Sequence, residues 1–101
     1  MKSVTLAANV ITQVSAAGNR DFINIQNNDA NSIYASYDSD VATAATGGTN
    51  PLTANNGWIV PGGGGTLSIS NDGLRNVWNK PVYLLSVAGT AANAIRIQGE
   101  Q

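Results

Sequence analysis

Short runs of alternating apolar and polar residues, separated by clusters of turn-forming residues, constrain this chain more than any other feature. Residues 22–26 read Phe-Ile-Asn-Ile-Gln, which places Ile23 and Ile25 on one face of an extended segment. The Asn- and Asp-rich cluster at 27–31 favours a turn, because these residues tolerate left-handed backbone. The alternation resumes at 33–37. The pattern predicts neighbouring β-strands joined by a turn.

The same pattern continues along the chain and predicts six to eight short strands. A helix would need apolar residues three and four positions apart, and no long window shows this spacing. The best helical candidate, 41–46, is too short and too rich in Thr to form one. We therefore predict an all-β fold, either a compact antiparallel β-sandwich or a β-barrel. The further strand candidates are 4–6, 11–14, 58–60, 66–70, 82–88 and 95–98.

The length of 101 residues predicts one domain, 1–101. We expect residues 1–20 to contribute an N-terminal arm and residues 38–56 to form a long loop. A loop of this length in so small a domain is usually functional, so we expect it to reach a neighbouring subunit. The segment 82–88 is apolar on both faces, which predicts the most central strand or one covered by a partner.

The composition favours a subunit of an assembly. Only 11% of the residues are charged, against about 25% in an average domain. Asn, Ser, Thr and Gly occupy 40 of the 101 positions. Small uncharged polar side chains suit surfaces that contact other surfaces, because their desolvation costs less than that of ions. The net charge of −1 gives no electrostatic footprint for nucleic acid, and no polybasic segment would hold an anionic membrane.

The residues that usually carry catalysis are scarce. The chain has no His and no Cys, which removes the commonest general base and the thiolate ligands of metals. Asp38 and Asp40 are expected to solvate a turn, with a calcium site or an acid–base pair as alternatives. The glycine run 62–65 lacks the Lys of a phosphate loop and is expected to be a wide turn after Pro61, with glycines at positive φ. We predict no enzyme, no catalytic residue, no cofactor and no metal ion.

The aromatic residues are expected in the core or at interfaces. Trp58 is expected in the core, with an interface or a ligand contact as alternatives. Trp78 lies among polar residues and is expected to be exposed or interfacial. Arg96 lies between two Ile residues, so it points away from the core, either as a solvated edge charge or in a salt bridge between subunits. The predicted interface residues are Trp78, Tyr34, Arg96, Pro51 and Leu52.

The N-terminal residues lack the continuous apolar stretch of a signal peptide, since Asn9, Thr12 and Gln13 interrupt it. No run approaches the roughly 18 apolar residues of a membrane-spanning helix. We therefore expect synthesis in the cytoplasm without export by the general secretion route.

Several segments resemble those of small tailed-bacteriophage virion proteins. Ile-Asn-Ile-Gln-Asn-Asn at 23–28, followed by Ile-Tyr-Ala-Ser-Tyr at 33–37, is similar to the opening of such sequences. The Pro-Gly-Gly turn at 61–63 and the apolar strand at 67–69 follow in the same order, and the closing segments at 82–90 and 95–97 also look similar. The resemblance spans roughly residues 22 to 98. It implies a capsid decoration (cement) protein, a head-fibre base, or another small head or tail component.

Our leading expectation is a non-enzymatic capsid decoration protein that self-associates and stabilises the head shell. The expected partners are copies of itself, with a trimer as one expected state, and the major capsid protein or another virion protein. The expected location is the capsid surface of the virion, after synthesis in the host cytoplasm. The alternatives are a tail or fibre component that binds a receptor, and a carbohydrate-binding β-sandwich module in which the Trp and Tyr residues stack on sugar rings.

Overall fold

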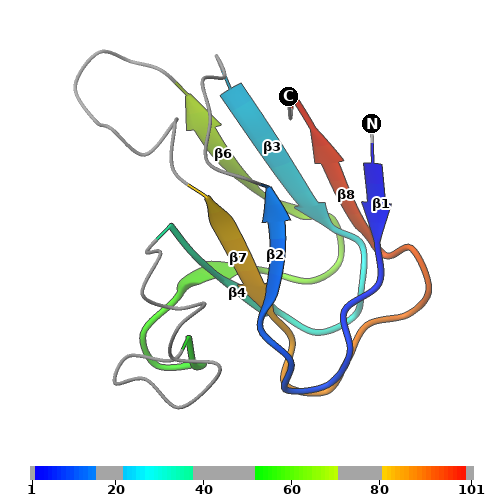
Figure 1. Ribbon diagram of the computed structural model, residues 1–101. Coiled ribbons are helices and arrows are strands. Elements are labelled where there is room, and N and C mark those ends of the chain that lie inside the picture. The colour runs from blue at the N-terminus through cyan, green and yellow to red at the C-terminus, as the bar shows by residue number, and fades with distance from the viewer. Residues whose placement is uncertain (1, 16–21, 38–51, 71–80, 100–101) are drawn as a thin grey trace.

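The computed structural model describes residues 2–15, 22–37, 52–70 and 81–99, and within them it contains eight β-strands and no helix (Figure 1). The predicted all-β fold is confirmed. Two strands have the predicted bounds, and the others differ by one to three residues. The strands are β1 (Lys2–Val4), β2 (Thr12–Ser15), β3 (Phe22–Asn27), β4 (Ile33–Ser36), β5 (Trp58–Val60), β6 (Gly65–Ser70), β7 (Val82–Leu85) and β8 (Ile95–Gln98).

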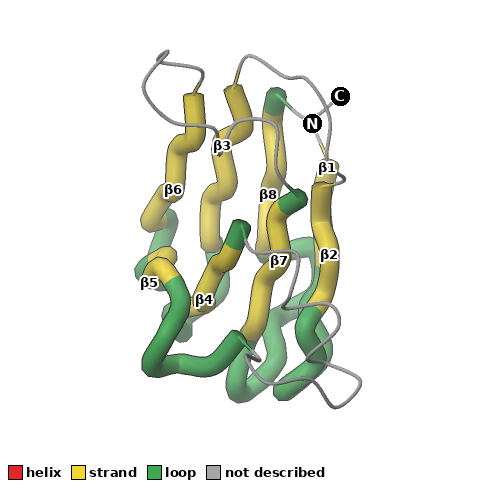
Figure 2. The backbone as a smooth tube through the Cα atoms, turned by 60° about the vertical axis from the view of Figure 1, so that its left-hand side comes forward, coloured by secondary structure: helices red, strands yellow, loops and turns green. Residues whose placement is uncertain are grey.

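The strands form two four-stranded sheets that lie face to face as a β-sandwich (Figure 2). One sheet has the order β1-β8-β3-β6 and the other the order β2-β7-β4-β5. All the strand pairs are antiparallel. Consecutive strands lie in different sheets except for β4 and β5, so the chain crosses repeatedly between the two layers. Of the two predicted architectures, the structure is therefore the sandwich.

The core lies between the sheets and is built by the predicted alternation. In β3, Ile23 and Ile25 are fully buried, while Asn24 and Gln26 lie on the other face. Fully burying one such apolar side chain stabilises the fold by roughly 1.5–3 kcal/mol relative to leaving it exposed. The largest fully buried apolar side chains come from strands of both sheets and from the connection between β1 and β2; they are Leu6, Ile23, Ile25, Ile33, Val60, Val82, Leu84, Ile95 and Ile97.

Strand β7 is the most thoroughly buried strand, and all four of its residues are shielded from solvent. It lies between β2 and β4, so the prediction that the apolar segment 82–88 contains a central strand is confirmed. Val82 and Leu84 join the core between the sheets. Tyr83 and Leu85 lie on the opposite face, where Leu52 packs against them. The chain itself therefore covers the outer face of β7. The alternative expectation, that a partner protein covers this strand, is not needed to explain its apolar outer face.

The N-terminal segment is part of the sandwich. Residues 2–15, most of the expected arm at 1–20, supply β1 to one sheet and β2 to the other. The Lys2 Nζ atom donates a hydrogen bond to the Val14 carbonyl oxygen at 2.6 Å, which links these two edge strands. For residues 2–15, the arm prediction is therefore wrong: apolar residues such as Leu6 and Val14 are buried in the core, which holds the segment against the sheets.

The glycine run forms the expected turn between β5 and β6. Gly63 and Gly64 have φ values of 73° and 99°, a region that favours glycine. Gly62 is needed for a different reason, because a Cβ atom there would lie 2.4 Å from the Ala30 carbonyl oxygen. The turn therefore packs directly on the connection between β3 and β4. Of the expected loop 38–56, residues 38–51 lie outside the described part of the chain.

Candidate functional site

Strand β5 presents large apolar side chains to solvent at the edge of its sheet. It is the last strand in the order β2-β7-β4-β5, and in the described residues no strand pairs with its second side. Trp58 and Ile59 are each 60% exposed, and only Val60 of this strand is buried. Pro61 follows directly, so the edge that is open to strand pairing is short. We call Trp58, Ile59 and Tyr37 the β5 edge surface.

The register of β5 on β4 decides where these side chains lie. Ile59 pairs with Tyr34, and both are on the outer face of the sheet. Trp58 pairs with Ala35, a core residue, so it lies on the inner side of the sheet at the open rim of the sandwich. The prediction that Trp58 lies in the core is therefore wrong. Because β5 is an edge strand, no further strand covers the inner position that Trp58 occupies.

The Trp58 ring is held against another aromatic ring. The centroids of the Tyr37 and Trp58 rings are 6.5 Å apart, and the rings are tilted by 31°. Such pairs contribute about 0.5–1.5 kcal/mol beyond the area they bury. Tyr37 itself packs on the core. Trp58 is therefore a supported, exposed aromatic residue, which is the form that the central residues of protein interfaces take.

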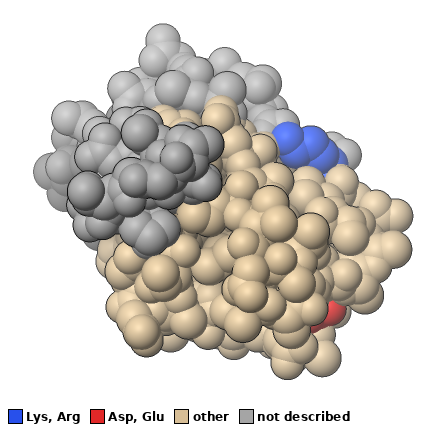
Figure 3. Space-filling model, turned by 60° about the horizontal axis from the view of Figure 1, so that its bottom comes forward, with Lys and Arg blue, Asp and Glu red and all other residues tan. Residues whose placement is uncertain are grey.

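Charge is nearly absent from the described surface. Among the described residues, the charged side chains are Lys2, Asp29 and Arg96. Figure 3 shows one end of the molecule, where charged side chains appear at only two places on the surface that is not grey. The β5 edge surface contains no charged residue. A partner that covered it would therefore desolvate apolar and aromatic groups without burying ions.

The structure does not gather the predicted interface residues in one place. Tyr34 is partly buried on the outer face beside Ile59. Leu52 is only 3% exposed and packs with Tyr83 and Leu85, so its side chain lies inside its own subunit. Arg96 is exposed on β8, in the other sheet. Trp78 and Pro51 lie outside the described residues.

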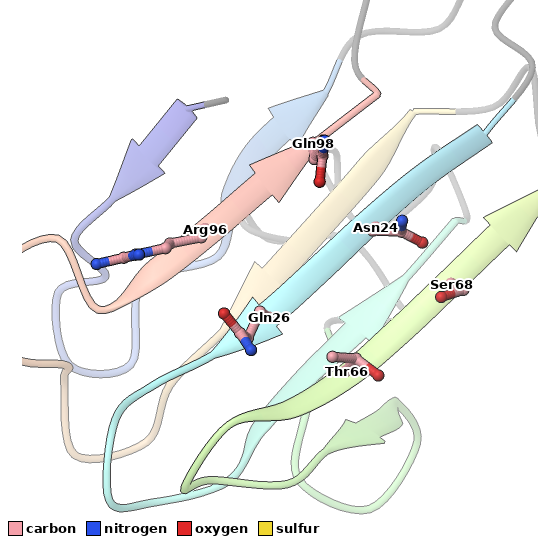
Figure 4. A pocket seen from close by; sticks show the side chains of 6 residues that line it. All are labelled: Asn24, Gln26, Thr66, Ser68, Arg96 and Gln98. Atoms are coloured by element: carbon pink, nitrogen blue, oxygen red, sulfur yellow. The ribbon is translucent and has the colours of Figure 1, made fainter.

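A second surface, which the sequence did not single out, lies on the outer face of the other sheet. Six polar side chains from β3, β6 and β8 line an open groove of about 250 Å³ (Figure 4). The register places Asn24 between Ser68 and Gln98, and Gln26 between Thr66 and Arg96. We call this the polar groove, lined by Asn24, Gln26, Thr66, Ser68, Arg96 and Gln98. Each strand shows the outward polar alternation in the sequence, but the side-by-side order of the three strands does not follow from it.

A buried polar cluster fixes the connection between β3 and β4. Asn27 is fully buried, and its Nδ2 atom donates to the carbonyl oxygens of Asn31 at 2.8 Å and Val60 at 3.0 Å. The carboxylate of Asp29 accepts backbone N–H groups from Ala91 at 2.9 Å and Asn31 at 3.2 Å. These hydrogen bonds lower the pKa of Asp29 below its usual value, and outweigh the opposing effect of desolvation. The cluster joins backbone segments, so its role is structural.

The described residues offer little for catalysis. Asp29 is the one carboxylic acid among them, and both of its oxygens already accept backbone N–H groups. This part of the chain contains no group of three residues that could hold a metal ion. Asp38 and Asp40 lie outside the described residues. No helix long and apolar enough to cross a membrane is present in the part of the chain that the structure describes.

Comparison with known proteins adds no assignment: no family model, curated protein or solved structure matches this chain. The function therefore has to be argued from the surfaces of the sandwich.

Proposed function

We propose that this protein is a non-enzymatic structural protein of a tailed-phage virion, a capsid decoration protein that self-associates through the β5 edge surface. The observation that carries the self-association is the 60% exposure of both Trp58 and Ile59 on an edge strand without charged residues. The virion role is supported by the resemblance of segments within residues 22 to 98 to small phage virion proteins. A decoration protein stabilises a shell by burying surface across the seams between neighbouring subunits.

The chemistry of the β5 edge surface fits the centre of a protein interface. Interface energy concentrates in a few residues, and Trp is among the most frequent of them. A stable interface buries about 800 Å² on each partner, so Trp58 and Ile59 form its centre and neighbouring segments must complete it. The low charge of the whole chain, 11% of residues, fits a protein whose surface is covered in an assembly.

Self-association is tested by light scattering coupled to size exclusion on the wild-type chain and on Trp58→Ser. The wild type is expected to form oligomers. Losing a central Trp should weaken association at least about 30-fold, since such residues contribute about 2 kcal/mol or more. Val87→Ser is the matched control, because Val87 is also apolar and 48% exposed but lies outside β5. A wild type that remains monomeric at high concentration would contradict self-association.

The virion role needs its own experiment. Heads of the phage that carries the gene, prepared without this protein, are mixed with purified wild type and sedimented. The proposal expects saturable co-sedimentation and a higher melting temperature of the decorated heads. Binding to host cells instead of heads would favour a receptor-binding tail or fibre component. Failure to bind heads at micromolar concentration would contradict the decoration role.

A further inference from the structure

We propose that the polar groove is a binding site for a neutral oligosaccharide. The groove lies on the sheet that does not contain β5, so this inference is independent of self-association through the β5 edge surface. It also differs in chemistry from the aromatic stacking that Trp and Tyr residues would provide.

The arrangement of the six side chains is the first argument. Figure 4 shows them on one side of the sheet, with amide side chains on the central strand β3 and small hydroxyl side chains on β6. Asn24 and Gln26 lie two positions apart on β3, so they point to the same face. The antiparallel register aligns each of them with one residue of β6 and one of β8. Two parallel rows of hydrogen-bonding groups therefore cross three strands.

The hydrogen-bonding capacity of the groove is largely unused. The amide of Gln26 accepts one hydrogen bond, from the Asn28 Nδ2 atom at 3.3 Å. Within the described structure, the other five lining side chains make no hydrogen bond or ion pair. Amides and hydroxyls both donate and accept, and the Arg96 guanidinium adds donors at the β1 side of the groove (Figure 4). A ligand could therefore form several hydrogen bonds in exchange for those to water, with at most one hydrogen bond within the protein, that of Gln26, in competition.

The lining chemistry selects the class of ligand. Sugar hydroxyl groups donate and accept, which matches rows of amides and hydroxyls. The described residues that line the groove include one cation and no carboxylate, too little charge to hold a nucleic-acid backbone. No large apolar side chain lines it, so it lacks the pockets in which apolar anchors of a protein partner would be buried. Near-neutral charge and dense hydrogen bonding together point to an uncharged polyhydroxyl chain.

The size of the groove limits what it holds. Sites that enclose a drug-sized ligand measure about 300–1,000 Å³, and this groove is smaller and open to solvent. It fits a short stretch of sugar rings lying across the strands. Binding in an open polar groove is weak per site, in the millimolar range, and would become effective only when several copies bind one glycan chain.

The test is a titration of the ¹⁵N-labelled full chain, followed by ¹H–¹⁵N correlation spectra. The probes are cellopentaose, maltopentaose and chitopentaose, with a galacturonate pentamer as the charged comparison. At least one neutral probe is expected to cause saturable shifts of the side-chain amide signals of Asn24, Gln26 and Gln98. The Gln13 amide, on β2 of the other sheet, should not move.

Variants decide whether the groove is responsible. Asn24→Ala and Gln98→Ala should each weaken binding at least about fivefold, because each removes a group that can form hydrogen bonds with the ligand. Gln13→Ala is the matched control and should bind like the wild type. The titration is also performed on Trp58→Ser. If self-association is lost but the oligosaccharide still binds, the two proposals are shown to be separate.

Four outcomes would overturn the proposal. The first is that no neutral probe shifts the amide signals even when its concentration is several times the expected millimolar dissociation constant. The second is that the shifts persist unchanged in Asn24→Ala and Gln98→Ala. The third is that only the galacturonate pentamer binds, which would make the face an anion site. The fourth is that the groove signals shift with protein concentration alone, which would make the face a contact between copies.

Discussion

The side chain of Asn27 connects the two sheets: from the end of β3 its Nδ2 atom donates a hydrogen bond to the carbonyl oxygen of Val60, the last residue of β5, at 3.0 Å. The Asn27 backbone carbonyl accepts from the Gly64 N–H at 2.8 Å, and its Oδ1 atom accepts from the Asp29 N–H at 3.0 Å. Asn27 thus ties the connection between β3 and β4 to the end of β5 and the glycine turn that follows it, two segments about 30 residues apart.

Asn27→Ala should destabilise the domain by about 2–3 kcal/mol, because it leaves buried backbone groups without partners. Chemical unfolding in urea measures the change. Asn28→Ala is the control, since the Asn28 side chain is exposed and its one hydrogen bond within the described residues is to Gln26, and it should change stability by less than about 0.5 kcal/mol. Equal effects of the two variants would show that the cross-sheet hydrogen bond contributes nothing specific.

Asp29 should make the stability depend on pH in the acid range. Its pKa in the folded chain lies below the ordinary value of an aspartic acid, chiefly because the Ala91 and Asn31 N–H groups favour the carboxylate. A carboxyl group with a lowered pKa stabilises the fold above its unfolded-state pKa, and this contribution is lost as the pH falls through the folded-state pKa. The stability difference between wild type and Asp29→Asn should therefore be constant above about pH 5 and shrink below about pH 4.

Urea unfolding of both chains between about pH 2 and pH 6 tests this, and taking the difference removes the titration of the other carboxyl groups. A difference that does not change with pH would contradict the assigned hydrogen bonds.

Gly62 and Gly63 should respond very differently to the same substitution. Gly62→Ala should cost more than about 4 kcal/mol or prevent folding, because its Cβ atom would meet the carbonyl oxygens of Ala30 at 2.4 Å and Asp29 at 2.7 Å. A Cβ atom added at Gly63 would have no atom of the described residues within 4 Å, so alanine meets only the unfavourable φ of 73°. Gly63→Ala should therefore cost only about 1–2 kcal/mol. Thermal unfolding followed by circular dichroism measures both, and a larger loss at Gly63 would contradict the close packing of this turn.

Ser86→Ala should leave the domain equally stable or make it more stable by up to about 1 kcal/mol. The Ser86 hydroxyl is fully buried and has no hydrogen-bond partner among the described residues, so its removal relieves an unfavourable desolvation. Ser68→Ala, an exposed hydroxyl on β6, serves as the neutral comparison. Urea unfolding that shows a loss of 1 kcal/mol or more for Ser86→Ala would mean that the hydroxyl has a partner, such as a buried water molecule.

The strands could be predicted because their signal is local. In 22–26 the alternation of Ile with polar residues is imposed by one buried and one exposed face, and the structure buries Ile23 and Ile25 as expected. The unbroken apolar segment at Val82–Leu85 likewise indicated burial on both faces. Both inferences need only the two-residue repeat of a strand.

The surfaces could not be predicted, because they depend on which distant segments meet. Trp58 was expected in the core and is exposed, since β5 is an edge strand, and no local pattern reveals the position of a strand in a sheet. Leu52 was expected at an interface, yet it covers the outer face of β7 from 30 residues earlier in the chain. The polar groove arises only when β3 lies between β6 and β8, an order set by pairing between segments far apart in the sequence.

The pairing of β1 with β8 has a consequence for the rate of folding. Lys2 lies opposite Ile97, so this edge of the sheet forms only when residues from nearly opposite ends of the described chain meet. Such contacts carry a large loop-closure entropy, so the sheet that bears the polar groove is expected to close slowly for a domain of this size. Until β1 has paired, the open edge of β8 can pair with a strand of another copy, so misassembly between copies is the expected competitor of folding.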